Sequence, residues 1–154
     1  MALSIRRAEE RDLPRILELY EQLALHSGTT PPDQWRSLLP LFKRIQADTQ
    51  QQLVVLEDSG RVVGTLVLII VPNLSHGGVS WSEVENVVVE ESVRGKGYGR
   101  ALMEWAEGEA KRQGCYKMQL LSHWERKDIA HPFYERLGYG SPTRAFRKYF
   151  KGEG

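Results

Sequence analysis

The sequence predicts a mixed α/β fold on three observations. Apolar residues recur every three to four positions in some segments and in alternating or continuous runs in others, which indicates helices and strands in one chain. Strand-like segments precede and follow helix-like ones, as in sheets covered by helices. A length of 154 residues, with 41% hydrophobic and 27% charged, suits one folded domain. We therefore expect a single domain over residues 3–154.

The N-terminal third predicts one strand and two helices. Leu3–Arg7 alternates apolar and polar residues, as a short strand does. Asp12 can cap the helix that follows, and Gly28 suits its end. The apolar stripe of that helix comprises Leu13, Ile16, Leu17, Tyr20, Leu23 and Ala24. A second helical stretch begins at Asp33, and Pro40 should kink or split it because proline lacks an amide donor.

The middle of the chain predicts three strands. Gln52–Glu57 and Arg61–Val71 are rich in Val, Leu and Ile, and Asp58-Ser59-Gly60 between them suits a hairpin turn. Ser80–Glu90 is the next strand, after the polar, glycine-containing loop Asn73–Gly78. The change from a helical to a strand-like pattern marks the start of this part of the sheet.

The last third alternates helices and strands. A glycine-rich turn at Gly95–Gly99 leads into a helix that ends at Gly114. Tyr116–Ser122 is a strand, Asp128–Leu137 a helix, and Phe146–Phe150 a final strand. The predicted element order is therefore β-α-α-β-β-β-α-β-α-β.

Charge and cysteine content argue against several classes of function. Lys and Arg number 21 against 20 Asp and Glu, a net charge of +1 that does not indicate binding to nucleic acid or an anionic membrane. The longest apolar run, Val62–Val71, is too short to span a bilayer. The only cysteine, Cys115, can form neither an intrachain disulfide nor a zinc cluster, and we expect it in the core. We expect a cytoplasmic protein without a metal.

The turn after strand Ser80–Glu90 carries the clearest chemical information. Its three glycines let backbone amides approach a ligand closely, and the helix N-terminus adds unpaired donors and partial positive charge. The cations of the turn are Arg94, Lys96 and Arg100. Together these features predict an anion site of pyrophosphate size. No Gly-Lys-Ser or Gly-Lys-Thr of a P-loop occurs, and Arg100 stands where a dinucleotide fingerprint needs its third glycine.

Two segments resemble the GNAT superfamily of N-acetyltransferases. Arg94-x-x-Gly97-x-Gly99 resembles its acetyl-CoA signature, (R/Q)-x-x-G-x-(G/A). Downstream, residues 130–139 read AHPFYERLGY and resemble the A-x-x-(F/L)-Y-x-x-x-G-(F/Y) segment. The element order is also similar over nearly the whole chain. Within the superfamily, the sequence looks most like acetyltransferases of small molecules, specifically of amino-sugar phosphates and aminoalkylphosphonates.

The resemblance implies acetyl-CoA as cosubstrate and a cleft where the sheet splays between Ser80–Glu90 and Tyr116–Ser122. Pantetheine would lie in that cleft against backbone groups, and the glycine-rich turn would hold the pyrophosphate. The implied cofactor-binding residues are Val87, Val88, Val89, Arg94, Gly95, Lys96, Gly97, Tyr98, Gly99 and Arg100. Lys127 stands where many relatives carry an Asn, so a contact of that Asn is not carried over.

Acetylation of an amine predicts a general base. An alkylamine with a pKa near ~10 is mostly protonated at neutral pH. Glu83 and Glu85 are two positions apart on a strand, so their side chains share a face. Both match places where superfamily members carry a catalytic Glu, and a surface ion pair is the other interpretation. We favour Glu85, because Val84-Glu85-Asn86-Val87 resembles the amino-sugar pattern more closely.

The resemblance also implies an acid and an oxyanion donor. Tyr134 occupies the superfamily's acid position and would protonate the departing CoA thiolate, the alternative being a core aromatic residue. A backbone amide near Val88 would stabilise the developing oxyanion.

The predicted function is acetyl-CoA-dependent transfer of an acetyl group directly to a primary amine of a small molecule. The resemblance further implies a homodimer. A protein N-terminal or lysine acetyltransferase of the same fold remains an alternative, as does a non-catalytic acyl-CoA-binding module.

Overall fold

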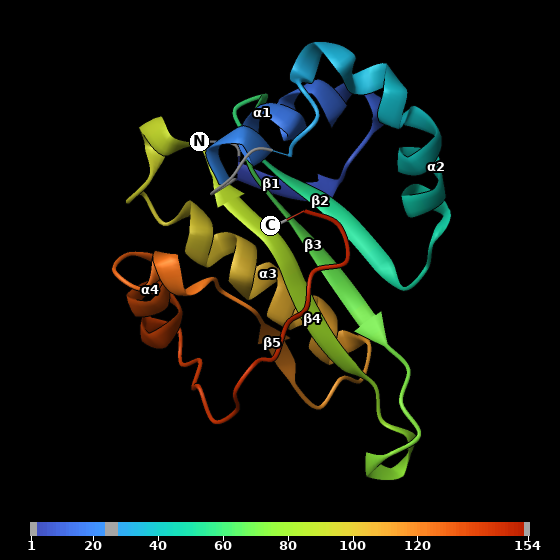
Figure 1. Cartoon of the computed structure of the whole chain (residues 1–154), viewed down its shortest axis with the longest axis vertical. Helices are drawn as coiled ribbons and strands as arrows, with labels where there is room; N and C mark the ends of the chain where they lie inside the picture. The colour runs from blue at the N-terminus through green and yellow to red at the C-terminus, as the bar shows by residue number, and fades with distance from the viewer. Residues whose placement is uncertain (1–2, 24–27, 153–154) are drawn as a thin grey trace.

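The structure, a computed structural model, describes residues 3–23 and 28–152 as a five-stranded sheet with helices on both faces (Figure 1). The strand order is β1-β2-β3-β4-β5, and only the last pair is parallel. The strands are β1 (Leu3–Arg7), β2 (Gln51–Asp58), β3 (Arg61–Val71), β4 (Trp81–Val89) and β5 (Met118–Leu120). The helices are α1 (Leu13–Leu23), α2 (Leu39–Ala47), α3 (Tyr98–Arg112) and α4 (Ala130–Arg136). The predicted α/β class is confirmed.

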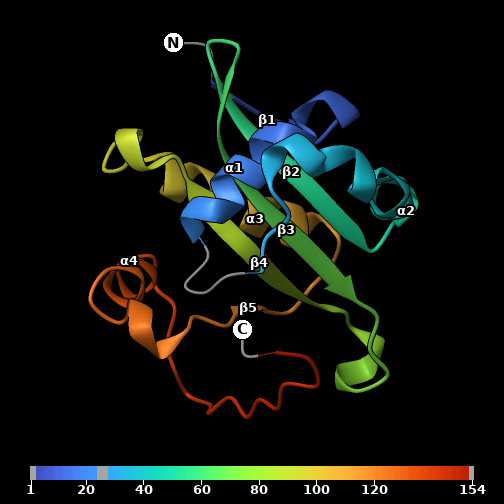
Figure 2. The same ribbon diagram turned by 45° about the horizontal axis from the view of Figure 1, so that its top comes forward.

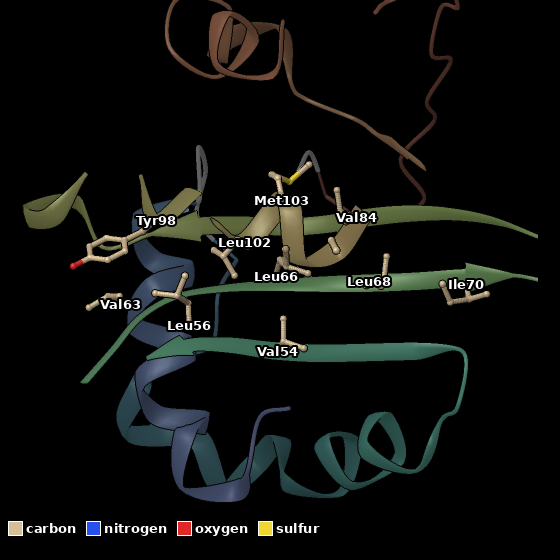
Figure 3. Packing of buried hydrophobic residues seen from close by; sticks show 11 residues of the cluster. Val54, Leu56, Val63, Leu66, Leu68, Ile70, Val84, Tyr98, Leu102 and Met103 are labelled. Carbon is tan, nitrogen blue, oxygen red and sulfur yellow. The ribbon is translucent and has the colours of Figure 1, made fainter. Parts of the chain in front are cut away.

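Two hydrophobic clusters hold the helices against the sheet, one on each face, and Figure 3 shows the cluster on the α3 face. The cluster under α3 includes Val54, Leu56, Leu66, Leu68, Val84, Leu102, Met103 and Ala106. The cluster under α1 and α2 includes Leu13, Ile16, Phe42, Leu53, Val55 and Val67. Neighbouring residues of β2 and β3 thus point to opposite faces and are all covered, which explains why both strands are continuous apolar runs.

The N-terminal helices differ from the prediction in detail. Asp12 ends a 3-10 turn, Glu10–Asp12, and α1 begins directly after it. The Asp12 carboxylate accepts from the Glu9 amide at 2.7 Å, so it caps that turn rather than α1, which corrects the predicted helix start. Pro40 lies in the first turn of α2, after a separate 3-10 segment, so the predicted split is confirmed. Ala24 lies outside the described residues.

The predicted final strand, Phe146–Phe150, is not formed. No main-chain hydrogen bond joins residues 140–152 to another described residue, and this segment extends from the sheet below β5 in Figure 2. Phe146 is 90% exposed and Phe150 is 91% exposed. A strand needs a neighbour for its backbone groups, so the three aromatic residues of this segment could not produce one alone. None of the helices in the described ranges is long and apolar enough to cross a membrane.

Gly64 of β3 sets how closely α3 approaches the sheet. A Cβ at this position would lie 3.0 Å from Cδ1 of Leu102 and 3.2 Å from the carbonyl oxygen of Val88. The side chain of Leu102 is fully buried there, so it has little room to move.

Replacing Gly64 by Ala should therefore overpack this contact and lower the free energy of unfolding by roughly 1–3 kcal/mol. Urea unfolding of Gly64→Ala measures the loss. Gly108→Ala is the matched control, because a Cβ on this α3 residue meets nothing within 4 Å. That change should stabilise the protein by roughly 0.5–1 kcal/mol. Equal effects of the two changes would contradict the close contact.

Candidate active site

The sheet opens between β4 and β5. Their parallel pairing consists of Ser82 with Met118, Glu83 with Gln119 and Val84 with Leu120. β4 then continues to Val89, while no described residue pairs with its β5-facing edge beyond Val84. The resemblance places the pantetheine cleft at this edge. That Val87, Val88 and Val89 bind pantetheine through their backbone stays a prediction.

A β-bulge interrupts β4 at the start of the open edge. Between Glu85 and Val88, β4 has two residues, Asn86 and Val87. Between the partners of Glu85 and Val88, β3 has only one residue. Asn86 has a φ of +53°, in the left-handed region that Asn tolerates better than most residues. Such an insertion reverses which face the following side chains take. The predicted base and the predicted oxyanion amide thus lie on either side of the bulge.

Glu83 and Glu85 share a half-buried face of β4, as predicted. Glu85 pairs with Val67, which belongs to the cluster under α1 and α2. Burial raises the pKa of Glu85 to about 7, and a hydrogen bond and charge repulsion from Glu83 add to the rise, while Arg147 opposes it. Gln119 donates to Oε2 of Glu83 at 3.5 Å. A carboxyl with a pKa near 7 is a suitable general base at neutral pH.

Tyr134 lies on α4, within electrostatic reach of Glu85. Burial raises the pKa of its hydroxyl, and the charge of Glu85 raises it further, while Arg126 opposes the rise. Tyr134 therefore stays protonated at neutral pH and can donate a proton or a hydrogen bond. Its ring also packs against the cluster under α3, so both predicted roles, acid and core aromatic, are compatible with its position.

The glycine-rich turn between β4 and α3 is exposed from Arg94 to Gly97. Gly95 and Gly97 have φ angles of +81° and +87°, which L-residues with side chains rarely adopt, and Gly97 is the N-cap of α3. A Cβ on either glycine would meet nothing within 4 Å and would project into open space. The third glycine serves packing instead. A Cβ at Gly99 would lie 3.1 Å from Cζ of Phe133.

Three side chains of this turn are already engaged within the protein. Nε of Arg94 donates to the carbonyl of Val89 at 3.0 Å. The buried Tyr98 donates its hydroxyl to the carboxylate of Asp58 at the end of β2, a bond that lowers the pKa of that carboxyl. Arg100 pairs with Glu104 at 3.4 Å on the exposed face of α3. Any contact of Tyr98 with an anion would therefore come from its amide.

Several residues around the site carried no signal in the sequence. Arg126 donates to the carbonyl of Leu23 and acts on Tyr134, and Arg147 acts on Glu85. Neither belongs to a motif, and only the fold brings them near residues far away in the chain. Lys127 lies over the ring of Trp124 at 5.4 Å. Cys115 is partly buried, and burial raises the pKa of its thiol, which disfavours the reactive thiolate.

No group of three or more His, Cys, Asp or Glu side chains gathers in metal-binding geometry within residues 3–23 and 28–152.

Comparison with known proteins identifies the family. The sequence profile of the acetyltransferase (GNAT) family matches residues 5–139. The chain belongs to this family. The GNAT resemblance of its two motifs is thereby confirmed, and acetyl-CoA-dependent N-acetyl transfer with it.

The chain is similar to characterised and structurally known proteins over most of its length. It is 33% identical over 146 residues to "Glucosamine 6-phosphate N-acetyltransferase" of Trypanosoma brucei brucei, covering 94% of each chain. It is 36% identical over 91 residues to "Aminoalkylphosphonate N-acetyltransferase" of Salmonella typhimurium, which is 58% of this chain and 57% of that protein. The structure of a "Putative acetyltransferase from Agrobacterium tumefaciens str. C58" superposes with a TM-score of 0.84 at 33% identity, covering 95% of this chain and 99% of that one.

Gly97 offers a direct test of the glycine-rich turn. The change Gly97→Val introduces a β-branched side chain at a φ of +87° and into the open space of the turn. Because the added side chain would occupy the space that a pyrophosphate needs against the turn, acetyl-CoA affinity should fall by about tenfold or more, which corresponds to about 1.4 kcal/mol or more of binding free energy. Isothermal titration calorimetry measures the loss.

The matched control is Gly78→Val in the β3–β4 loop. Gly78 has a φ of +81° and open space around its Cβ, but it lies at the opposite end of β4. Equal acetyl-CoA affinity of folded Gly97→Val and wild-type protein would remove the turn from the cofactor site.

Proposed function

We propose that this protein transfers the acetyl group of acetyl-CoA directly to the primary amine of a small phosphorylated or phosphonate-bearing molecule. One observation carries the proposal. A carboxyl with its pKa raised to about 7 lies where the β4–β5 pairing ends, within electrostatic reach of a protonated tyrosine. The names of the relatives support an amino-sugar phosphate or an aminoalkylphosphonate as acceptor.

The residues present fit acetyl-CoA. The exposed turn offers the amides of Gly95 and Gly97 in open space at the N-terminus of α3, beside the cation of Lys96. This is the arrangement that binds a pyrophosphate. When bound, acetyl-CoA supplies an activated acetyl group as a thioester. The unpaired edge of β4 supports backbone hydrogen bonds to an extended chain such as pantetheine.

The protein's part in the reaction is proton transfer and orientation. Glu85 takes a proton from the acceptor ammonium, directly or through water, and leaves the amine free to attack. The amide of Val88, just beyond the bulge, stabilises the negative charge that develops on the acetyl oxygen. Tyr134 donates its hydroxyl proton to the sulfur as the carbon–sulfur bond breaks, and the excess proton that the newly acylated nitrogen still carries returns to the tyrosinate through water. Each of these three residue roles is part of the proposal.

Two cations near the carboxyl–tyrosine pair support an anionic acceptor. Arg147 and Arg126 lie close enough to Glu85 and Tyr134, respectively, to affect their pKa values. A phosphate or phosphonate on the acceptor would complement them. A peptide acceptor and a non-catalytic binding module remain the alternatives that the experiment must separate.

The test is a thiol-release assay with acetyl-CoA against a panel of acceptors. The panel contains amino-sugar phosphates, aminoalkylphosphonates, the same amines without the phosphorus group, polyamines, amino acids and a lysine peptide. The proposal expects turnover with the phosphorylated amines and much weaker turnover with their unphosphorylated counterparts. Preference for the peptide would favour the protein acetyltransferase, and acetyl-CoA binding without turnover would favour the binding module.

We also propose one domain over residues 3–154, a cytoplasmic location and a homodimer, with no nucleic-acid or membrane partner. The exposed Phe146 and Phe150 lie on an unpaired segment, and no described residue pairs with the outer edge of β5. A second copy of the chain would cover such apolar and backbone groups. Light scattering of the protein and of Phe146→Asp/Phe150→Asp tests the homodimer.

Glu85→Gln tests the base. The amide keeps the shape of the side chain but cannot accept the ammonium proton, so turnover at neutral pH should fall by roughly 10²–10⁴. In wild-type protein, kcat/KM should rise with pH through about 7, because Glu85 must lose its proton to act. The deficit of Glu85→Gln should shrink at high pH, where the amine deprotonates unaided.

Glu83→Gln is the matched variant for the same profile. It removes the charge that raises the pKa of Glu85 but keeps the burial that contributes most. The rise of kcat/KM with pH should therefore occur at lower pH than in the wild-type protein, with its midpoint still above the ordinary carboxyl pKa of 4.5. A larger loss of turnover for Glu83→Gln than for Glu85→Gln would transfer the role of base to Glu83.

Tyr134→Phe tests the acid. The change keeps the ring and its packing and removes only the hydroxyl, whose contribution is confined to the transition state. We expect kcat to fall at least about tenfold, with little change in acetyl-CoA affinity or Tm. Normal turnover with a lower Tm would assign Tyr134 to the core.

A further inference from the structure

The ring of Tyr134 is held between two aromatic neighbours. Phe133 meets it at a centroid distance of 5.1 Å and an angle of 61°, and Tyr139 at 6.2 Å and 78°. Both are the edge-to-face geometries that aromatic pairs favour. The chain turns back at Gly138, whose φ is +92°, so that the amide of Tyr139 donates to the carbonyl of Tyr134 at 3.1 Å. Tyr139 therefore contacts Tyr134 through both ring and backbone.

Tyr139 is in turn anchored to α3. Its hydroxyl donates to Oε1 of the half-buried Glu107 at 2.7 Å. Burial and this bond together raise the pKa of Tyr139, so the hydroxyl remains a donor throughout the neutral range. The family segment accepts either Phe or Tyr at this position. The hydroxyl and its carboxylate partner are therefore features of this chain that the motif does not require.

The two aromatic neighbours of the Tyr134 ring, Phe133 and Tyr139, both contact α3. Phe133 lies over Gly99 in the first turn of α3, and Tyr139 is bonded to Glu107 farther along it. α4 itself has only seven residues, too few to hold its geometry without tertiary contacts. Loss of the Glu107 bond would leave Tyr139 with its ring contact but without its polar anchor.

We propose that Glu107 is a positioning residue, which acts through the hydroxyl of Tyr139 to hold Tyr134 in the orientation needed for proton donation. The inference rests on the proposed acid role of Tyr134. A displacement of a reacting group by about 1 Å can lower a rate by as much as about 10², so a modest loosening of the ring should be measurable.

The experiment compares Tyr139→Phe, Glu107→Ala and Glu107→Gln in the full chain. The first two remove the bond from opposite ends and should each lower kcat by about three- to tenfold, with KM for acetyl-CoA unchanged. Glu107→Gln keeps an oxygen acceptor for the hydroxyl and should restore most of the lost kcat. A merely structural role would lower Tm and leave kcat intact at a temperature where the variants are folded.

A double variant tests whether the effect passes through Tyr134. In the Tyr134→Phe background there is no hydroxyl to orient, so adding Tyr139→Phe should cause no further loss of kcat. Tyr116→Phe is the matched control. Tyr116 stacks on His76 at 4.4 Å, before the start of β5 and away from α4, and the same substitution there should leave kcat unchanged.

The outcomes separate this inference from the proposed function. If Tyr134→Phe retains normal turnover, the acid assignment fails and the positioning role fails with it. If Tyr134→Phe is slow but Tyr139→Phe and Glu107→Ala are normal, only the positioning role is overturned. If the two losses of kcat multiply in the double variant, the positioning role is likewise overturned, because Tyr139 would then act independently of Tyr134.

Discussion

The short pairing between β4 and β5 is the constraint on which the site depends. After three residue pairs the two strands part, and β4 continues to Val89 with one edge unpaired by the described chain. Unpaired backbone groups are costly unless water or a ligand satisfies them. The separation of the two strands leaves this edge open on both faces of the sheet. Tyr134 of α4 lies on one face, and the carboxylates of Glu83 and Glu85 lie on the other. This edge is where pantetheine would pair as a strand does in the proposed binding mode.

α3 connects the parts of the site that the parting separates. Its N-terminus carries the glycine-rich turn, the proposed anion site, which Tyr98 fixes to the β2–β3 hairpin through Asp58. Its buried face lies close to β3 because Gly64 leaves room for Leu102. Gly99 and Glu107 on the same helix hold the aromatic residues around Tyr134. One rigid element therefore sets the position of the glycine-rich turn relative to Tyr134, the proposed acid, as precise catalytic geometry requires.

Local patterns predicted most of the fold, and long-range contacts decided the remainder. The hairpin at Ser59-Gly60 followed from turn chemistry, and the glycine-rich turn at the N-terminus of α3 followed from glycine spacing next to an apolar strand. Phe146–Phe150 has a strand pattern, but pairing depends on a neighbouring edge that no local pattern encodes. The pair Glu83 and Glu85 was visible in the sequence. The raised pKa of Glu85 was not, because its burial beside Glu83 arises only in the folded chain.

The raised pKa of Glu85 matters because the substrate is a strong base. Moving a proton from an alkylammonium of pKa near ~10 to a carboxyl of pKa about 7 is uphill by roughly 4 kcal/mol. The same transfer to a carboxyl at its ordinary value of 4.5 would be uphill by roughly 7 kcal/mol. Burial beside Glu83 thus removes close to half of this cost. The raised pKa has the opposite effect on folding stability, which it lowers at neutral pH. A carboxyl whose pKa is raised in the folded state stabilises the fold below pH 4.5, and this contribution is lost as the pH rises through about 7. In the proposed mechanism, the protein accepts a less stable carboxylate at neutral pH in return for a base whose pKa lies closer to that of its substrate.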